Sequence, residues 1–361
     1  MRSHAGDGRA VYARGLYAAL RENGVEVRIW DPPSLGRAFG SALSIIWYDI
    51  IAPFVFLILP SAYRRYRLIH AAFPEQGLWF PILKIRKVLT VHDLNPLLDK
   101  GSSLTQILWN LYARIIYSIA IGFADHIIAV STQTKDELQS IAGVKEHRIT
   151  VIAPGIADAF TPRPRTINLD PLIGFVGKLT ERKNVGFLLD SLKTLTISDS
   201  SRRWRLAIYC GESVKVERPG SVAGRDSDDR VTFHPFVPAT EMPNVYTRFF
   251  VMIYPSKHEG FGFPILEAQR CGTPVIITEG SRIPDEVARY TLKAKSPLEA
   301  AHICIRLIEN KELYDQTSRE ASVYAGTFSW QVQAREVENL YESLLASSVK
   351  SDRASDQLHT E

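Results

Sequence analysis

The chain alternates between short runs of apolar, often β-branched residues and longer stretches with helical periodicity. Runs of the first kind are typical of buried strands, and the longer stretches are typical of amphipathic helices. In the first part of the chain the pattern predicts strands at residues 25–30, 67–71, 87–93, 126–131 and 149–155, and helices at residues 10–24 and 134–143. This alternation indicates a parallel sheet covered by helices.

The same alternation restarts after residue 171. It predicts strands at residues 172–177, 205–211, 230–236, 250–256 and 274–278, with helices from Val185 and inside residues 258–277. Residues 157–171 separate the two halves and carry three prolines without periodicity. We therefore predict an α/β fold with two doubly wound sheets in series. Ligands of such sheets bind at the carboxyl ends of the strands, so a cleft between the two sheets is expected.

Residues 258–277, HEGFGFPILEAQRCGTPVII, place two glutamates eight positions apart around a glycine-rich turn. Pro264 and Gly272 mark the start and the end of a short helix. Exposed amides at the start of a helix favour a phosphate group. Glu267 is expected in the first turn of this helix and Glu259 ahead of the glycine-rich turn, so one ligand could contact both carboxylates.

This stretch resembles the E-x7-E element of the large retaining glycosyltransferase family usually numbered four. Further segments resemble family segments in the same order: ADHIIAVSTQTKDEL, RITVIAPGI, GFVGKLTERKNVGFLLDSL, RVTFHPFVP and FSWQVQAREVENLYESLL. The resemblance runs through most of the chain, and bacterial polysaccharide mannosyltransferases are the members it suggests. It implies the GT-B architecture, with two facing Rossmann-like domains, and a hexosyltransferase that uses a nucleotide sugar and no metal.

The resemblance also implies a division of the chain. Residues 1–157 would form an amino-terminal acceptor-binding domain, residues 158–170 a linker, and residues 171–330 a nucleotide-sugar-binding domain. Residues 331–347 would form a last helix that crosses back to the amino-terminal domain, and residues 348–361 a flexible tail.

Site residues follow from the family motifs, residue by residue. Glu259 would contact the hydroxyls of the donor sugar, and Glu267 would hold the nucleotide ribose. Lys178 and Lys183 would neutralise the diphosphate, although the family usually has arginine at Lys178, so the bidentate fork of a guanidinium is lost there. The turn would present its backbone to the same donor through Gly260, Phe261 and Gly262.

His92 follows a predicted strand in LTVHDLNP and resembles the family histidine that faces the donor sugar. Together with Glu259 and Lys183, it is expected to act at the reacting centre. Gly6, Asp7 and Gly8 resemble the family's first loop, where they would border the acceptor and the donor diphosphate. The retaining class is thought to use front-side attack, with the donor's own phosphate helping to accept the proton.

One feature departs from the family. Members normally begin with a strand ahead of the glycine-rich loop, whereas only MRSHA precedes Gly6 here. We therefore expect the first strand of the amino-terminal domain to be missing. Such a gap in a central position would cost several kcal/mol, so either the start is assigned too late or the product is impaired.

Composition narrows the class and the compartment. The chain has 361 residues, 45% hydrophobic and 23% charged, which is typical of a globular protein with two domains. Its three cysteines are far apart and form neither a zinc motif nor a disulfide framework. No charged-apolar-small signal opens the sequence, so a reducing cytoplasm is expected. The D-x-D from Asp226 to Asp228 lies in a polar turn, and no metal site is expected there.

Charge and one apolar segment bear on the partners. Residues 1–155 hold 17 Lys and Arg against 12 Asp and Glu, while the remainder is nearly balanced. No nucleic-acid-binding motif is present, so the positive half points to an acidic acceptor or an anionic lipid surface. Residues 44–60 are apolar but contain Asp49 and Pro53, which disfavours a transmembrane helix. A buried or groove-lining segment is favoured, and a surface-lying segment with the basic flank YRRYR is the alternative.

The sequence therefore predicts a retaining, metal-independent glycosyltransferase acting on a glycan or lipid-linked acceptor in cell-surface polysaccharide biosynthesis. GDP-mannose is the favoured donor, and UDP-glucose stays open. Peripheral association with the cytoplasmic membrane face is expected. Two alternatives remain: a sugar-nucleotide-binding protein without turnover, motivated by the missing strand and Lys178, and a nucleotide-sugar epimerase of similar layout.

Overall fold

The structure is a computed structural model that describes residues 8–29, 66–98, 104–163, 170–210, 228–235 and 237–358. The chain divides into two compact units. The first consists mainly of Arg9–Gly155 with Trp330–Glu361, and the second mainly of Ile156–Ser329. Several residues discussed above lie outside the described parts: Gly6, Asp7, residues 44–60 and Asp226.

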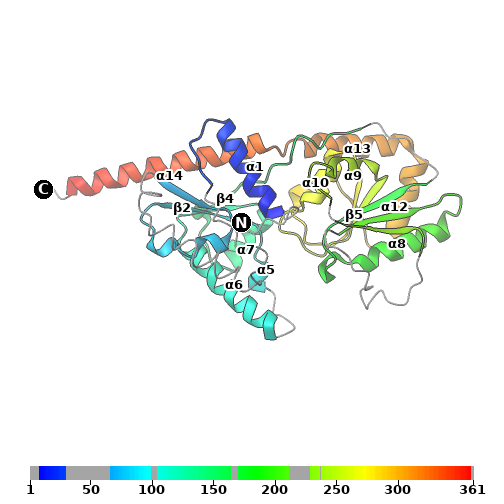
Figure 1. Ribbon diagram of the computed structural model, residues 1–361, viewed down its shortest axis with the longest axis horizontal. Helices are drawn as coiled ribbons and strands as arrows, with labels where there is room; N and C mark the ends of the chain where they lie inside the picture. Colours follow the sequence, from blue (N-terminus) through cyan, green and yellow to red (C-terminus); the bar gives the residue numbers. More distant parts are fainter. Residues whose placement is uncertain are drawn as a thin grey trace. The chain divides into compact units, whose positions relative to one another are not determined.

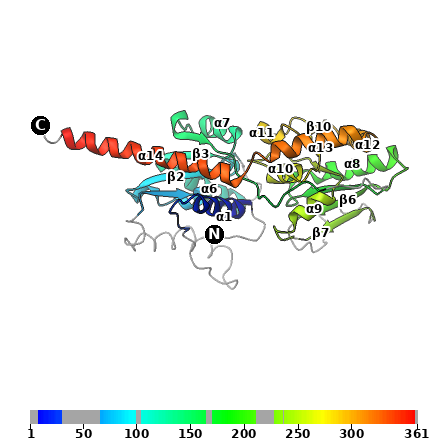
Figure 2. The same cartoon turned by 90° about the horizontal axis from the view of Figure 1, so that it is seen from above.

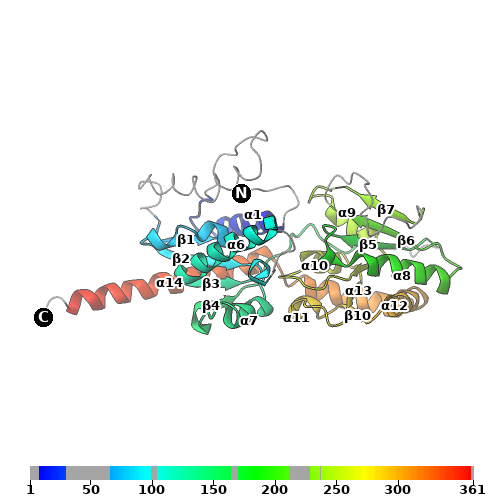
Figure 3. The same ribbon diagram turned by 90° about the horizontal axis from the view of Figure 1, so that it is seen from below.

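A four-stranded parallel sheet in the order β1-β2-β3-β4 forms the centre of the first unit (Figure 3). Its strands are β1 (Leu68–Ala71), β2 (Arg86–Val91), β3 (His126–Ala129) and β4 (Ile149–Val151). Each overlaps a segment that the hydrophobic pattern predicts as a strand, and these four predictions are confirmed.

Helices cover both faces of this sheet (Figure 1). One face packs against α1 (Gly8–Glu22) and α14 (Trp330–Leu358), and the other against α6 (Leu104–Phe123). Side chains on a strand alternate between faces, so Val88 joins the core under α1 and α14 while Leu89 joins the core under α6. The unit also contains η2 (Pro74–Gly77), η3 (Phe80–Ile82), α5 (Asn95–Leu98), α7 (Thr132–Ser140) and η4 (Glu146–Arg148).

The strand predicted at residues 25–30 is not formed over Val25–Ile29, so that prediction is wrong for the described part of the segment. Its apolar positions still work as predicted, since Val25 and Val27 pack against the core under α1. A strand also needs a neighbour for its backbone hydrogen bonds. Within the described residues the sheet ends at β1, and no strand is paired to the outer edge of β1.

The second unit has a six-stranded parallel sheet in the order β10-β9-β8-β5-β6-β7. Its strands are β5 (Leu172–Val176), β6 (Arg205–Tyr209), β7 (Val231–His234), β8 (Val251–Tyr254), β9 (Val275–Thr278) and β10 (Leu292–Ala294). The pattern predicts the first five of these and misses only the short edge strand β10. The two parallel α/β sheets therefore agree with the predicted fold class.

Helices of the second unit surround this sheet, and α8 lies beside α12 in Figures 1 and 2. They are η5 (Glu181–Lys183), α8 (Val185–Ser198), α9 (Met242–Arg248), α10 (Phe263–Arg270), α11 (Asp285–Ala288), α12 (Pro297–Glu309) and α13 (Lys311–Ala325). The predicted helix stop after α10 is confirmed, because Gly272 has a left-handed φ of 72° and donates to Gln269 O at 2.8 Å.

The last helix is longer than the sequence predicts. α14 continues to Leu358, beyond residue 347 where the tail is expected to begin. Residues 348–358 contain neither glycine nor proline, so nothing in the local sequence ends the helix. Among the described residues, no helix is both long enough and apolar enough to cross a membrane.

Candidate functional site

Two neighbouring strands of the second unit deliver the central pair of the candidate site. β5 and β8 are adjacent and parallel, so their carboxyl ends lie at the same edge of the sheet. Lys183 closes η5, which follows the loop after β5, and Glu259 lies in the loop that follows β8. The proximity of Lys183 and Glu259 therefore follows from parallel strand geometry.

Lys183 and Glu259 form a buried ion pair. Lys183 Nζ lies 2.6 Å from Glu259 Oε1, and the two residues are only 7% and 8% exposed. Ser256 Oγ donates to the same carboxylate oxygen, and Tyr254 OH lies 3.2 Å from it. The ammonium also donates to Tyr254 OH and lies 4.5 Å from the centre of its ring. The charge of each partner is thus compensated by the other and by hydroxyl groups.

Arg182 adds a second cation that sequence analysis missed. Its guanidinium contacts Glu259 Oε2 at 2.9 Å and donates to the backbone oxygen of His258. Its own backbone oxygen accepts from Lys257 N at 2.9 Å. Arg182 therefore ties η5 to three consecutive residues ahead of α10. Its place directly before Lys183 is the only signal the sequence offers.

The electrostatics of this cluster leave an excess of positive charge. Burial alone would raise the pKa of Glu259, but Lys183 and Arg182 outweigh it, so that pKa lies below its ordinary value. Burial lowers the pKa of Lys183, and Glu259 partly offsets this. Burial also raises the pKa of Tyr254 well above its ordinary value, so Tyr254 stays a neutral donor. One carboxylate balances one of the two cations, which leaves a net charge suited to an anionic ligand.

The two lysines predicted to bind the diphosphate both follow β5, but they lie in different environments. Gly177 has a φ of 153°, a backbone conformation that side chains rarely adopt, and a Cβ there would make only an ordinary contact of 3.5 Å with Lys183 Cε, so the backbone conformation and not the space favours glycine. Lys178 is exposed on the same loop. Within the described residues no ion pair involves Lys178, and it is not part of the buried cluster.

The glycine-rich turn leads directly into α10. Gly262 is the N-cap residue with a φ of 108°, a conformation that favours glycine. A Cβ there would lie 3.3 Å from Val287 Cγ1. Gly260 precedes it in the turn, and the ring of Phe261 packs between Phe263 and Phe328. Phe261 is therefore available to a ligand only through its backbone.

Glu267 is the fifth residue of α10, so it lies in the second turn of the helix and not in the first as predicted. Its carboxylate accepts a hydrogen bond from Tyr246 OH at 2.7 Å. Although part of the residue remains accessible, its carboxylate is surrounded by protein, and this desolvation raises the pKa of Glu267 to about 7. The two motif glutamates are thus different: Glu259 is ionised and paired with cations, and Glu267 titrates near neutral pH.

His92 belongs to the first unit, directly after β2. Its Nε2 lies 3.2 Å from Ala72 O, and its ring stacks on Phe73 and meets Tyr12 edge-on. The imidazole is therefore held by packing on two sides and by the backbone. Gly8, which the sequence predicts to border the donor diphosphate, is the first residue of α1.

A buried polar network lies next to His92. Tyr12 OH bonds Thr90 Oγ1 at 3.0 Å, and Thr90 Oγ1 bonds His70 Nε2 at 2.7 Å. His70 Nδ1 in turn bonds Tyr341 OH on α14 at 2.6 Å. Burial lowers the pKa of His70 to about 4, so the ring is neutral at physiological pH. This network joins α1, β1, β2 and α14.

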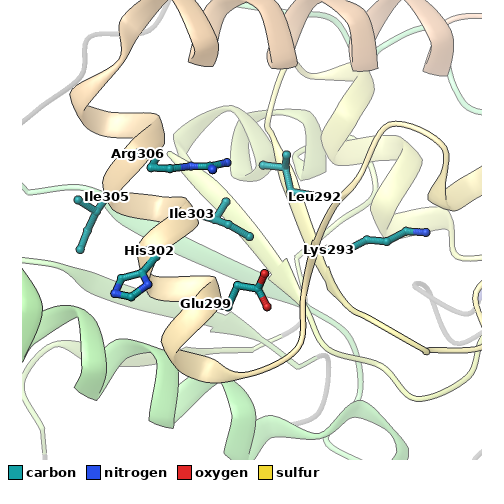
Figure 4. A pocket seen from close by; sticks show the side chains of 7 residues that line it. All are labelled: Leu292, Lys293, Glu299, His302, Ile303, Ile305 and Arg306. Atoms are coloured by element: carbon teal, nitrogen blue, oxygen red, sulfur yellow. The ribbon is translucent and has the colours of Figure 1, made fainter.

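One cavity of about 580 Å³ lies elsewhere in the second unit, between α12 and β10 (Figure 4). Glu299, Ile303 and Arg306 reach from α12 toward Leu292 and Lys293. The Glu299 carboxylate accepts a hydrogen bond from Lys295 N at 2.7 Å, and this contact lies at the amino-terminal end of α12. The cavity contains none of the predicted site residues.

The predicted D-x-D retains only Asp228 within the described residues. Both of its carboxylate oxygens lie 2.7 Å from Arg230 nitrogens. Among the described residues no group of histidine, cysteine and acidic side chains could hold a metal ion.

Two family models match the chain, one after the other. Glycosyltransferase Family 4 matches residues 6–160, and Glycosyl transferases group 1 matches residues 170–310. The second match contains the whole cluster around Lys183 and Glu259. The first match contains His92 and three residues of the neighbouring network, Tyr12, His70 and Thr90, whereas Tyr341 on α14 lies outside both matches.

Similar proteins agree with this assignment. The D-inositol 3-phosphate glycosyltransferase of Frankia alni is 29% identical over 63% of this chain and 60% of its own length. The O-antigen chain mannosyltransferase RfbU of Salmonella typhimurium is 27% identical over 55% of this chain and 53% of its own length. The chain thus spans between about half and three fifths of the length of these relatives.

A solved structure gives the same picture of the fold. Anabaena HepE in complex with UDP-glucose is similar with a TM-score of 0.68 at 18% identity, covering 95% of this chain and 98% of that one. The two consecutive model matches, the two parallel α/β sheets and this similarity lead to one conclusion. The chain belongs to glycosyltransferase family 4, the group 1 glycosyl transferases of GT-B fold.

Proposed function

We propose that this chain is a retaining glycosyltransferase that transfers a hexose from a nucleotide diphosphate sugar to a glycan or lipid-linked acceptor. The observation that carries the proposal is the buried Lys183–Glu259 pair at the carboxyl ends of β5 and β8, next to the turn that begins α10. Burying two charges is costly, so a pair kept at a ligand-binding edge is better explained by a ligand than by stability.

In this proposal the donor diphosphate joins Glu259 as a hydrogen-bond acceptor for the Lys183 ammonium. Lys183 would share its protons between the carboxylate and the β-phosphate, and Glu259 would accept hydrogen bonds from the sugar hydroxyls. Breaking the anomeric C–O bond leaves negative charge on the β-phosphate, so a cation already aimed there lowers the barrier. Loss of one such donor typically costs about 3 kcal/mol, or roughly a hundredfold in rate.

The remaining site residues have proposed roles of the same kind. Glu267 would accept from the ribose hydroxyls in its ionised form, and Lys178, Gly8 and the backbone of residues 260–262 would contact the diphosphate. His92 would contact the donor sugar. Proton transfer from the acceptor would go to the donor's own phosphate, as in front-side attack, and no metal would take part.

The favoured donor is GDP-mannose. The name of the related O-antigen chain mannosyltransferase supports mannose, and the complex of HepE with UDP-glucose supports the competing choice. The positive charge of residues 1–155 suits an acidic or lipid-linked acceptor at the cytoplasmic membrane face, within the synthesis of a cell-surface polysaccharide.

A donor screen tests the proposal. Thermal shift with GDP-mannose and UDP-glucose should single out one donor, since a ligand at about 100 times its Kd adds roughly 2.7 kcal/mol. Radiolabelled transfer to membranes should then proceed equally in Mg²⁺ and in EDTA. The variant Lys183→Met should weaken the thermal shift and lower the rate of transfer roughly a hundredfold.

The two alternatives predict other results. A sugar-nucleotide-binding protein without turnover would show the thermal shift but neither transfer nor hydrolysis of the donor. An epimerase would convert the free nucleotide sugar in the absence of an acceptor. Either result would rule out the proposed glycosyl transfer.

A further inference from the structure

The helix α6 (Leu104–Phe123) carries an exposed apolar stripe on the first unit. Ile107, Leu108, Leu111 and Ile115 are between 48% and 58% exposed. With 3.6 residues per turn, these positions lie on one side of the helix. Where side-chain exposure is described, which for α14 means residues 330–347, every other helix carries at most one exposed large hydrophobic side chain, so the stripe is not an ordinary surface.

The opposite side of α6 is already buried in the first unit. Ala113, Tyr117, Ala120 and Ile121 are buried, and the last three belong to the core against the sheet. The amino-terminal half of α6 extends away from the sheet of its unit (Figure 1). The exposed stripe is therefore not part of the core, and it needs a separate explanation.

The charge around the stripe fits an anionic lipid surface. α6 has no acidic residue, and its one charged residue, Arg114, is exposed at the edge of the stripe. η3, which packs on α6, adds Ile82 with 58% exposure and is followed by exposed Lys84. Glu75 in the neighbouring η2 is half-buried.

We infer that α6 is a membrane-docking helix that lies in the headgroup region of an anionic bilayer. Ile107, Leu108, Leu111 and Ile115 enter the acyl boundary, while Arg114 and Lys84 contact lipid phosphates. Such a helix lies on the membrane and does not cross it. The inference goes beyond the proposed glycosyl transfer, and its test requires no turnover.

Binding of the full chain to vesicles tests the inference. Vesicles of phosphatidylglycerol and phosphatidylcholine should bind the protein, and pure phosphatidylcholine should bind it at least tenfold more weakly. The double variant Leu108→Gln with Leu111→Gln should bind the anionic vesicles at least tenfold more weakly than the wild type. Arg114→Gln should weaken binding about fivefold and reduce its salt dependence.

The matched control lies in the other unit. Ile197 on α8 is 74% exposed, so Ile197→Gln removes a comparable apolar side chain away from α6. This variant should bind vesicles as the wild type does. Equal loss in both variants, or full binding by the Leu108 and Leu111 double variant, would overturn the inference.

Two further measurements exclude other occupants of the stripe. Brominated lipids should quench the fluorescence of a tryptophan placed on the stripe by Leu111→Trp more strongly than that of one placed on α8 by Ile197→Trp. Sedimentation should show the same oligomeric state for the wild type and the double variant. A dimer that dissociates in the double variant would assign the stripe to a second copy of the chain, and equal quenching in Leu111→Trp and Ile197→Trp would place the lipid elsewhere.

The proposed function and this inference fail separately. Hydrolysis of the free donor in solution requires no contact with a membrane and should be unchanged in the double variant. Donor hydrolysis without vesicle binding would overturn only the role of α6.

Discussion

The two units each bury polar side chains beside the carboxyl end of a central strand, but they do so in different ways. In the first unit Tyr12, Thr90, His70 and Tyr341 form a neutral network of hydrogen bonds. In the second unit Lys183, Arg182 and Glu259 form an ionic cluster. Hydrogen bonds alone satisfy the neutral network, whereas the ionic cluster keeps an uncompensated positive charge.

This difference separates a structural role from a ligand-binding role. The neutral network links α14 to the sheet and packs Tyr12 against His92, so it holds the histidine without titrating near pH 7. The ionic cluster is more expensive to bury and offers charge to an anion. The comparison leads to four predictions, taken from the largest effect to the smallest.

The largest effect is expected for Glu259→Ala, which leaves Lys183 buried without its counter-ion. We expect a loss of about 3–5 kcal/mol in the free energy of unfolding, confined to the second unit. Hydrogen exchange of β5 and β8, compared with β2 and β3, measures this. The double variant Lys183→Met with Glu259→Met should recover the stability but no donor hydrolysis, since it removes both charges together. Wild-type protection in Glu259→Ala would contradict the ionic cluster.

The pH dependence of stability should have opposite signs in the two units. The folded pKa of Glu267, about 7, lies above its ordinary value of 4.5, so its contribution is complete below pH 4.5 and is lost as pH rises toward 7. The folded pKa of His70, about 4, lies below 6.5, so its contribution is complete above pH 6.5 and is lost as pH falls toward 4. Each loss amounts to roughly 3 kcal/mol.

Urea denaturation across this pH range checks the signs, with Glu267→Gln and His70→Gln as the variants. Each substitution should flatten the slope of its own unit and leave the other slope in place. Two slopes of the same sign would show that the units do not differ in this respect.

A smaller effect is expected for Tyr341→Phe, which leaves His70 Nδ1 without the hydroxyl it now contacts. Loss of a partner inside a buried neutral network should lower the free energy of unfolding by about 1–3 kcal/mol. Chemical denaturation measures it, with Tyr290→Phe as the control on a residue that is 37% exposed. Donor affinity should not change, and a large change in affinity would link the network to the donor site.

The smallest effect on stability is expected for Arg182→Gln, because the Arg182 side chain is 39% exposed and its ion pair is screened. We expect a change below about 1 kcal/mol in unfolding. As a positioning residue for Glu259, Arg182 should matter more for turnover, with kcat about tenfold lower and KM little changed. Arg182→Lys should restore part of kcat, and Arg203→Gln serves as the exposed control. A change in KM alone would assign Arg182 to donor binding.

Much of the fold could be predicted from the sequence because strands and helices alternate with clear periods. Nine of the ten strands in the described part of the chain coincide with predicted runs, and the end of α10 at Gly272 follows from local glycine chemistry. The prediction of a strand at residues 25–30 is wrong over Val25–Ile29. Alternating apolar residues indicate which side chains are buried, but they do not show that a neighbouring strand is available for pairing. The polar sequence after residue 347 predicts a loose tail, whereas α14 continues to Leu358, because a polar segment without glycine or proline can still form a helix.

The candidate site was only partly predictable. The motif spacing pointed to Lys183 and Glu259, and parallel strands bring such loop residues to one edge of a sheet. Nothing in the sequence distinguishes the exposed Lys178 from the buried Lys183, or shows that Arg182 contacts Glu259. Those properties depend on how each loop folds over its strand, which local sequence does not determine.

By itself, the sequence determined the two α/β halves, the family and the residue types available for binding a diphosphate. Only the tertiary structure decided which of these residues share a low-dielectric environment. Contact between distant loops sets the charge balance around Glu259, the raised pKa of Glu267 and the neutral state of His70. The physical reason is that desolvation and charge pairing depend on what surrounds a group in space, and neighbours in space are far apart along the chain.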